Sequence, residues 1–249
     1  MPFFKKMIFP PKCVGCGELF DIFDGAPDLV LCERCMNHWL AAKSQRCREC
    51  NVPIGLCRCI PNPMLRSGVC DFIKAVPYDV NNRSSVQDRF IYRMKHKRDE
   101  RAAYFAAEQL CDELLRRLAE NNCKLENTVI TYVPRLRKAI TENGVDQSEC
   151  IASSIGKILK IPCMNLIGRC RDGREQKKLT SRERKENVRN AFKISYEVRL
   201  DGRTVLLFDD VVTTGSSMAR CAELLFSVGA EKVISVAVGK TNRKNVQTR

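Results

Sequence analysis

Residues 205–217 read V-L-L-F-D-D-V-V-T-T-G-S-S. Four apolar residues lead into two adjacent aspartates, Asp209 and Asp210, and the segment then turns to small hydroxylated residues. Neighbouring carboxylates repel each other, and the end of a buried strand disfavours the charge on either one. We therefore expect cationic groups, or a ligand rich in hydroxyls, to meet this pair.

The residues after the aspartates have the composition of an anion-binding turn. Their backbone N–H groups can surround an anion just before a helix N-terminus, which adds its own positive end. The candidate phosphate-binding residues are Val211, Val212, Thr213, Thr214, Gly215, Ser216 and Ser217. The segment has neither the Gly-Lys-Ser/Thr of a Walker A loop nor the glycines of a dinucleotide fingerprint. A phosphate site preceded by two carboxylates that accept ribose hydroxyls predicts a ribose 5-phosphate ligand. The alternative is a helix N-terminus capped by an ordinary aspartate.

From residue 70 onward the pattern alternates between strands and helices. We predict strands at 69–76, 128–133, 163–167, 204–208 and 232–238, and helices at 86–97, 100–120, 146–159 and 216–228. Asp146, followed three residues later by Glu149, is typical of a capping box. This alternation predicts an α/β fold whose mostly parallel sheet is flanked by helices and binds ligands at the carboxyl ends of its strands.

The amino-terminal part is rich in cysteine. Eight of the 15 cysteines lie in the first 59 residues, and their spacing predicts two closed tetrathiolate zinc sites with structural roles. The predicted ligands are Cys13, Cys16, Cys32 and Cys35 for one site, and Cys47, Cys50, Cys57 and Cys59 for the other. An interleaved cross-brace pairing remains open, and His38 is interpreted as a surface or packing residue. Five scattered cysteines are interpreted as small buried hydrophobes: Cys111, Cys123, Cys150, Cys163 and Cys221.

Two domains are predicted: a small cysteine-rich double zinc-ribbon module at 1–66, and an α/β domain at 70–249. The Pro-Asn-Pro stretch at 61–63 is expected to end the module, with a linker continuing to residue 69. The formal net charge of +14 favours anionic partners. Eight zinc-bound thiolates would lower that charge by about four. No apolar run reaches a membrane-span length and no signal peptide is evident, so we expect a cytoplasmic protein without membrane insertion.

Residues 205–217 resemble the PRPP-binding motif of type I phosphoribosyltransferases. The whole chain resembles the ComF family of competence-associated proteins, in which a cysteine-rich zinc module precedes a phosphoribosyltransferase-like domain. Further residues that carry the resemblance are Lys95, Gly144 with Gln147, Gln176 with Leu179, Arg184, and the segment 187–192.

The resemblance implies roles for individual residues. Asp209 and Asp210 would bind the ribose hydroxyls as the catalytic pair, and Val211 to Ser217 would bind the 5-phosphate of PRPP, which acts with Mg²⁺. The turn formed by Val133, Pro134 and Arg135 would hold the pyrophosphate, and residues 168–187 would form a mobile hood. One departure concerns this turn. Where the family has arginines around a glycine, this chain has Glu142, Asn143, Val145 and Asp146 around Gly144, which leaves Arg135, Arg137 and Lys138.

Two functions follow from the resemblance. One is a PRPP-dependent transferase that displaces pyrophosphate from the ribose C1 by an acceptor that the sequence does not identify. The other is a non-catalytic PRPP-binding factor that handles single-stranded DNA with the competence machinery. The segment 168–190, with nine Lys or Arg against four acids, suits either a polyphosphate or a nucleic acid strand, or is simply a solvated loop. The oligomeric state is not predicted.

Overall fold

A computed structural model describes residues 10–20, 29–81, 83–96, 99–136, 140–142, 144, 146–170 and 191–241. Its centre is a four-stranded sheet built from β1 (Asp71–Tyr78), β2 (Thr128–Tyr132), β5 (Thr204–Val212) and β6 (Lys232–Thr241). The strand order is β1-β6-β5-β2, and every neighbouring pair is parallel. The prediction of a parallel sheet is therefore confirmed.

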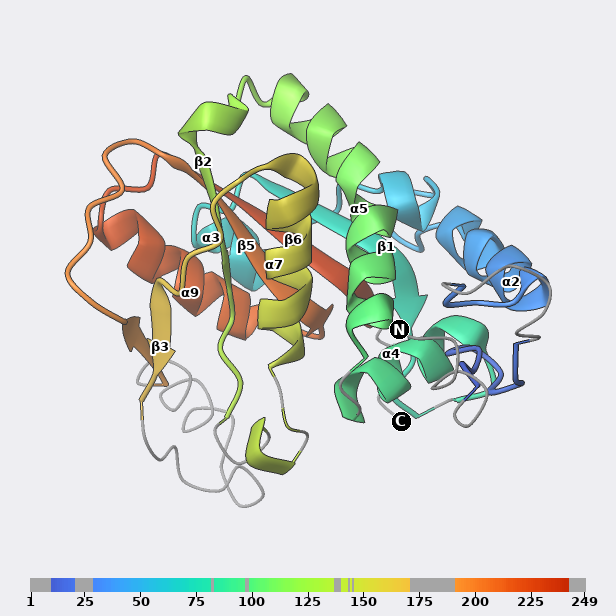
Figure 1. The fold of residues 1–249 in the computed structure, drawn as a ribbon. Helices are drawn as coiled ribbons and strands as arrows, with labels where there is room; N and C mark the ends of the chain where they lie inside the picture. Colours follow the sequence, from blue (N-terminus) through green and yellow to red (C-terminus); the bar gives the residue numbers. More distant parts are fainter. Residues whose placement is uncertain are drawn as a thin grey trace, which may run out of the picture.

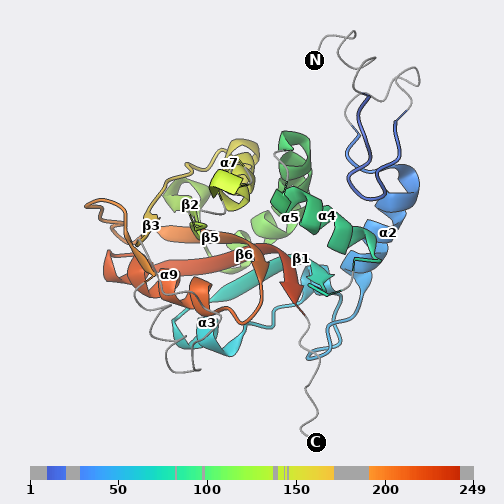
Figure 2. The same ribbon diagram turned by 90° about the horizontal axis from the view of Figure 1, so that it is seen from below.

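Helices cover both faces of this sheet (Figures 1 and 2). On one face lie α4 (Val86–His96), α5 (Glu100–Glu120) and α7 (Gln147–Leu159), and on the other lie α3 (Asn62–Arg66) and α9 (Ser216–Ser227). Alternation along β5 supplies both cores, because Leu206 and Phe208 pack toward the first face while Val205 and Leu207 pack toward the second. A strand buried on both faces reads as a continuous apolar run, which is why 205–208 carries no polar residue.

Several predicted boundaries are confirmed closely and two are wrong. Helix α5 spans the predicted 100–120, and Asp146 caps α7 by accepting from the N–H groups of Ser148 and Glu149. The strand expected at 163–167 begins later: β3 is Ile167–Arg169, paired antiparallel with β4 (Phe192–Ile194), whereas Cys163 makes only one parallel bridge with Ile130. The linker expected after residue 63 is instead helix α3, which packs on α9.

The cysteine-rich segment lies beside the β1 edge of the sheet and contains α2 (Glu33–Ser44) and the 3-10 turn η1 (Ile54–Leu56) (Figure 2). A second 3-10 turn, η2 (Leu125–Asn127), leads into β2. Among the scattered cysteines, Cys111 and Cys221 are buried as predicted, whereas Cys123 and Cys150 are half-buried and Cys163 is exposed, so the prediction of burial is wrong for these three. Within the described residues, no helix is long and apolar enough to cross a bilayer.

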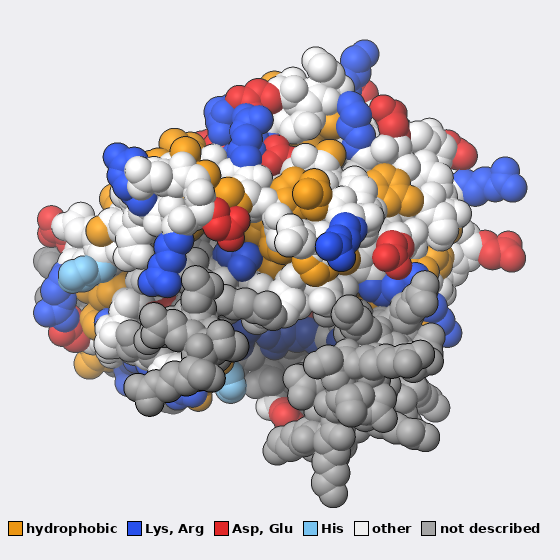
Figure 3. Space-filling view, turned by 180° about the vertical axis from the view of Figure 1, so that it is seen from behind, with side chains coloured by type: hydrophobic (Ala, Val, Ile, Leu, Met, Phe, Trp, Pro, Cys, Tyr) orange, Lys and Arg blue, Asp and Glu red, His pale blue; other side chains and the backbone are white. Residues whose placement is uncertain are grey.

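Positive charge is dispersed on the face opposite that of Figure 1. There, Lys and Arg side chains of the described residues alternate with acidic and apolar ones and form no single continuous patch (Figure 3). Most of the basic segment predicted at 168–190 is not part of this description, because residues 171–190 lie outside the described residues. The formal charge of +14 thus does not by itself mark a binding face.

Candidate ribose-phosphate site and cysteine clusters

Strand β5 carries the paired aspartates to the carboxyl edge of the sheet. It runs further than predicted, through Val212, and its ladder with β6 continues to the pair Val212–Lys240. Asp210 is 4% exposed and Asp209 is half-buried. Because Val211 and Val212 belong to the strand, the turn that can surround an anion is shorter than predicted and consists of residues 213–217.

Two cations meet Asp210. Arg135 contacts the carboxylate through Nη2, and Lys95 from α4 lies with its Nζ 3.5 Å from Oδ1. Asp209 instead accepts from the backbone N–H of Asp210 at 2.9 Å and lies 3.5 Å from the Ser148 hydroxyl. The expectation that cationic groups meet the pair is confirmed for Asp210. Burial, reinforced by the Asp210 charge, raises the pKa of Asp209 to about 8.

Arg135 lies in the turn after β2, as the expected pyrophosphate loop requires. Its backbone N–H donates to Asp146 Oδ2 at 2.9 Å, and its Nη1 donates to Gln147 Oε1 at 2.6 Å. These bonds hold the guanidinium against Asp210 from the start of α7. The Nε2 group of Gln147 is buried and has no hydrogen-bond partner among the described residues. Arg137 and Lys138 lie outside the described residues.

The turn between β5 and α9 leaves the helix N-terminus without a cap from the N-cap residue, because Gly215, with φ +80°, has no side chain. The N–H of Ser216 donates to the Thr214 hydroxyl oxygen at 3.3 Å, so the following N–H groups of the first turn are the ones that can meet an anion. The Thr214 and Ser216 hydroxyl oxygens lie 3.0 Å apart at the mouth of this turn. A Cβ at Gly215 would lie 2.7 Å from Met64 Sδ, so α3 directly supports the turn.

Two functional candidates were not assigned by sequence reasoning. Lys95 was noted only as part of the resemblance, yet it reaches Asp210. Lys240, at the end of β6, donates to the carbonyl of Thr213 at 3.3 Å. The position of Lys240 near the end of the last strand is a partial signal. If that strand pairs in parallel with the strand that carries Asp209 and Asp210, both end at the same edge of the sheet. The sequence does not show which strands pair.

The cysteines form two separate clusters that follow chain order. Cys13, Cys16, Cys32 and Cys35 make one cluster, and Cys47, Cys50, Cys57 and Cys59 make the other. Within each, the four sulfur atoms lie within 4.8 Å of one another, so the sequential pairing is confirmed over a cross-brace. Four convergent thiols are the donor set that a tetrahedral Zn²⁺ takes. Burial opposes ionisation, yet backbone N–H groups lower the pKa values of Cys13 and Cys47 to about 7.

The first cluster is held to the α/β domain by packing and by arginines. Trp39 of α2 packs edge-on against Phe90 and Phe105, at centroid distances of 5.0 and 5.4 Å. Arg93 donates to the Val14 carbonyl at 2.8 Å, and Arg89 to the Gly15 carbonyl at 2.8 Å. Two arginines of α4 therefore bind the backbone of the cysteine module.

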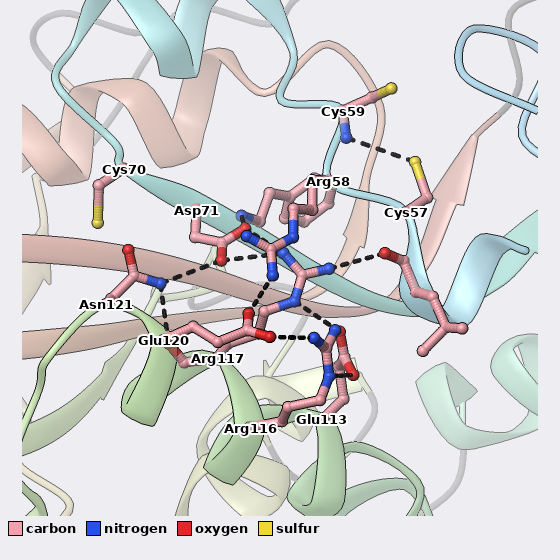
Figure 4. Close-up of polar contacts among 12 residues, drawn as sticks. Cys57, Arg58, Cys59, Cys70, Asp71, Glu113, Arg116, Arg117, Glu120 and Asn121 are labelled. Carbon is pink, nitrogen blue, oxygen red and sulfur yellow. Dashed lines mark hydrogen bonds and ion pairs between the residues drawn. The ribbon is translucent and has the colours of Figure 1, made fainter. Parts of the chain in front are cut away.

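The second cluster is held by a buried polar network (Figure 4). Arg117 of α5, fully buried, donates to both carboxylate oxygens of Asp71 at 2.8 and 3.0 Å and to the Leu56 carbonyl at 2.8 Å. Lys74 of β1 donates to the carbonyls of Cys57 and Cys59 at 2.8 and 3.2 Å. These bonds tie the segment around η1 to the sheet edge and to α5.

Comparisons with known proteins agree with this architecture. The phosphoribosyl transferase domain model matches residues 148–248. The DNA utilization protein YhgH of Salmonella typhi is 28% identical over 212 residues, which cover 80% of this chain and 89% of that protein. Competence protein F of Haemophilus influenzae is 30% identical over 112 residues, which cover 44% of this chain and 48% of that protein.

Among solved structures, a hypoxanthine phosphoribosyltransferase from Staphylococcus aureus aligns at 15% identity and a TM-score of 0.35, over 59% of this chain and 70% of that one. The match is too distant to carry an argument about function. The domain model and the curated relatives together show what this chain is similar to, a phosphoribosyl transferase domain and proteins named for DNA utilization and competence, and with the cysteine clusters they support a ComF-family protein.

Proposed function

We propose that this protein binds PRPP, or another ribose 5-phosphate, at the carboxyl edge of its sheet, and that it serves DNA utilization or competence as its relatives' names suggest. One observation carries the binding proposal. The paired carboxylates at the end of β5, the turn 213–217 at the N-terminus of α9, and Arg135 converge on one edge of the sheet. Carboxylates accept ribose hydroxyls, and the open helix N-terminus accepts a phosphate.

The residues present fit each part of PRPP. Asp209 and Asp210 would accept the ribose hydroxyls, and the hydroxyls and backbone N–H groups of 213–217 would hold the 5-phosphate. Arg135 and Lys95, which now pair with Asp210, carry the charge that a pyrophosphate group needs. Mg²⁺, when bound with PRPP, would offset part of the diphosphate charge. If the site turns PRPP over, the chain contributes by positioning the ribose and by stabilising the leaving pyrophosphate.

We also propose that both cysteine clusters hold structural Zn²⁺. The four thiols of each cluster would fill all four positions of a tetrahedral ion and would leave none for water. Metal analysis of protein purified without chelators should give close to two zinc ions per chain. A preparation that folds and contains no zinc would contradict this proposal.

Calorimetry with PRPP and Mg²⁺ tests the ribose-phosphate site. The double variant Asp209→Asn/Asp210→Asn should bind PRPP about ten- to hundredfold more weakly, because it loses the charge-assisted acceptance that Asp210 offers a ribose hydroxyl and the carboxyl group of Asp209. Asp201→Asn is the matched control, since Asp201 is exposed, lies at φ +45°, and faces no part of the site. Unchanged affinity in the double variant would overturn the proposed site.

A second function, PRPP binding without turnover, has one observation in its favour. Asp210 already engages both Arg135 and Lys95, so the cations near the pyrophosphate position are shared with the protein's own carboxylate. Pyrophosphate release from PRPP in the presence of candidate bases distinguishes the two functions. Binding of single-stranded DNA, measured at a fixed salt concentration, tests the DNA-handling role of the non-catalytic alternative directly.

A further inference from the structure

A cavity of about 590 Å³ lies between the second cysteine cluster and the phosphate turn. Thr213, Thr214 and Ser216 line one part of it, Cys47 and Cys59 another, and the end of β6 closes a third. The volume falls in the range of small-molecule pockets, about 300–1,000 Å³. Neither Asp209 nor Asp210 lines the cavity, so it extends from the phosphate turn away from the ribose position.

Basic side chains line this cavity. Three basic residues, Arg48, Lys74 and Lys240, line it together with one acidic residue, Glu49. Lys74 is 3% exposed, and its ammonium group bonds the carbonyls of Cys57 and Cys59, so it offsets the negative charge of a metal-loaded thiolate cluster. Lys240 donates to the carbonyls of Thr213 and Thr241 at 3.3 and 2.8 Å, so it also has partners within the protein. Arg48, which is exposed, is the cation that we assign to a ligand beside the turn.

The rest of the lining adds apolar surface. Ile54, Pro61 and Pro63 border the same space as the three hydroxyls of the phosphate turn. A free ribose 5-phosphate would use the turn and leave the cavity to solvent. A cavity that combines cations and apolar side chains suits a substituent on that phosphate which is itself partly anionic and partly apolar, such as a second phosphate carrying a nucleoside.

We propose that the site accepts ribose 5-phosphates whose phosphate carries a further group, either a second phosphate through an anhydride or a nucleoside through an ester, with that group held in this cavity and recognised by Arg48. The inference rests on the proposed function, because it places the ribose at Asp209 and Asp210. Two sources share this chemistry. One is a small diphosphate such as ADP-ribose, and the other is the 3′-terminal nucleotide of an RNA strand, whose ribose has both hydroxyls and a 5′-phosphodiester.

Calorimetry at fixed salt with ribose 5-phosphate, ADP-ribose and an RNA trinucleotide tests the proposal. ADP-ribose should bind the full-length protein about tenfold more tightly than ribose 5-phosphate, which corresponds to about one added charge-assisted contact. Arg48→Gln should remove about three- to tenfold of the ADP-ribose affinity and change that of ribose 5-phosphate less than about twofold. Arg66→Gln, the same charge change at an exposed residue of α3 outside the cavity, should change neither.

The outcomes separate cleanly. Tight, Arg48-dependent binding of ADP-ribose alone assigns the cavity to small diphosphates, and equal behaviour of the trinucleotide extends it to RNA ends. ADP-ribose binding no tighter than ribose 5-phosphate, or an Arg48→Gln loss shared equally by all three ligands, would overturn the inference and leave the proposed function standing. Failure of wild-type protein to bind either PRPP or ribose 5-phosphate would instead overturn the proposed function.

Discussion

The two cysteine clusters have the same chemistry but join the protein in different ways. The first belongs to the largest apolar core, in which Cys13, Cys35 and Trp39 pack with side chains of α4 and α5. The second forms its own small cluster with Ile54, and buried polar bonds from Arg117 and Lys74 attach it. The first cluster is therefore attached mainly by apolar packing, and the second mainly by directional hydrogen bonds.

This difference predicts different weaknesses. Apolar packing tolerates small shifts of the side chains. Breaking a buried ion pair is costly, because the remaining group stays charged in the protein interior without its partner. The second cluster also borders the phosphate turn through the cavity and through α3, so damage there reaches the ligand site. Damage to the first cluster instead reaches the common core.

The largest effect should come from Cys35→Ala, compared with Cys50→Ala. Cys35 is buried in the common core and Cys50 is exposed. We expect Cys35→Ala to cost on the order of 5 kcal/mol or more, enough to unfold most of the chain, because the loss of zinc there also disrupts the common apolar core. Cys50→Ala should release one zinc ion and lower the melting temperature far less. Thermal unfolding with zinc analysis measures both, and equal losses of stability would refute the contrast between the clusters.

The next effect should come from Arg117→Ala. It removes the cation that pairs with the buried Asp71 and leaves that carboxylate only its bonds from Asn121 and the Phe72 backbone, so we expect a loss of about 3–5 kcal/mol in the free energy of unfolding. Arg116→Ala is the matched control on the same helix. Arg116 is on the surface, and its pairs with Glu113 and Glu120 are expected to contribute at most about 1 kcal/mol. Urea unfolding gives both values, and similar losses for the two variants would mean that the buried network does not hold the second cluster.

Much of the fold could be predicted because local patterns agree with it. The apolar spacing of 100–120 and the Asp146 cap are local signals, and both matched the structure. The length of β5 could not be predicted. Its last residues are polar or follow polar residues, and only the ladder with β6, a long-range pairing, extends the strand to Val212. Helix α3 is not predicted for the same reason, since five residues that include Pro63 and follow Pro61 become helical where Met64 is buried beneath α9.

The site was predicted in part. The motif at 209–217 identified the carboxylates and the turn because adjacent residues carry that chemistry. Lys95 and Lys240 were not assigned roles, because each reaches the site only after distant segments are brought together. The way in which the cysteine module packs on the sheet and helices could not be predicted from the sequence for the same reason. Arg93 and Arg117 look like surface charges in the sequence, and their carbonyl and carboxylate partners are remote along the chain.

A smaller effect should come from Gly215→Ala, which tests the link between α3 and the phosphate turn. The residue has φ +80°, and a Cβ would lie 2.7 Å from Met64 Sδ. The left-handed backbone alone costs an alanine about 1–2 kcal/mol, so we expect a loss of stability near that size and weaker binding of ribose 5-phosphate. The double variant Gly215→Ala/Met64→Ala should regain part of the affinity by clearing the contact. Ribose 5-phosphate calorimetry tests this, and no recovery in the double variant would show that α3 does not support the turn.

The last prediction concerns the pH dependence of stability, because protonation is a further way in which a carboxyl group can be buried. Burial and the Asp210 charge raise the pKa of Asp209 to about 8, so the folded chain keeps a proton that the unfolded chain releases near pH 4. Between these values the folded state binds more protons, and the free energy of unfolding therefore falls as pH rises. One proton gives a slope of at most about 1.4 kcal/mol per pH unit, and partial exposure of Asp209 makes it smaller.

Asp209→Asn should flatten this slope relative to wild type, whereas Asp201→Asn should not. Urea unfolding from pH 5 to pH 8 measures the difference, in which the titration of the cysteine clusters cancels. Parallel curves for wild type and Asp209→Asn would mean that Arg135 and Lys95 neutralise both aspartates, and that the site is charge-balanced before any ligand arrives.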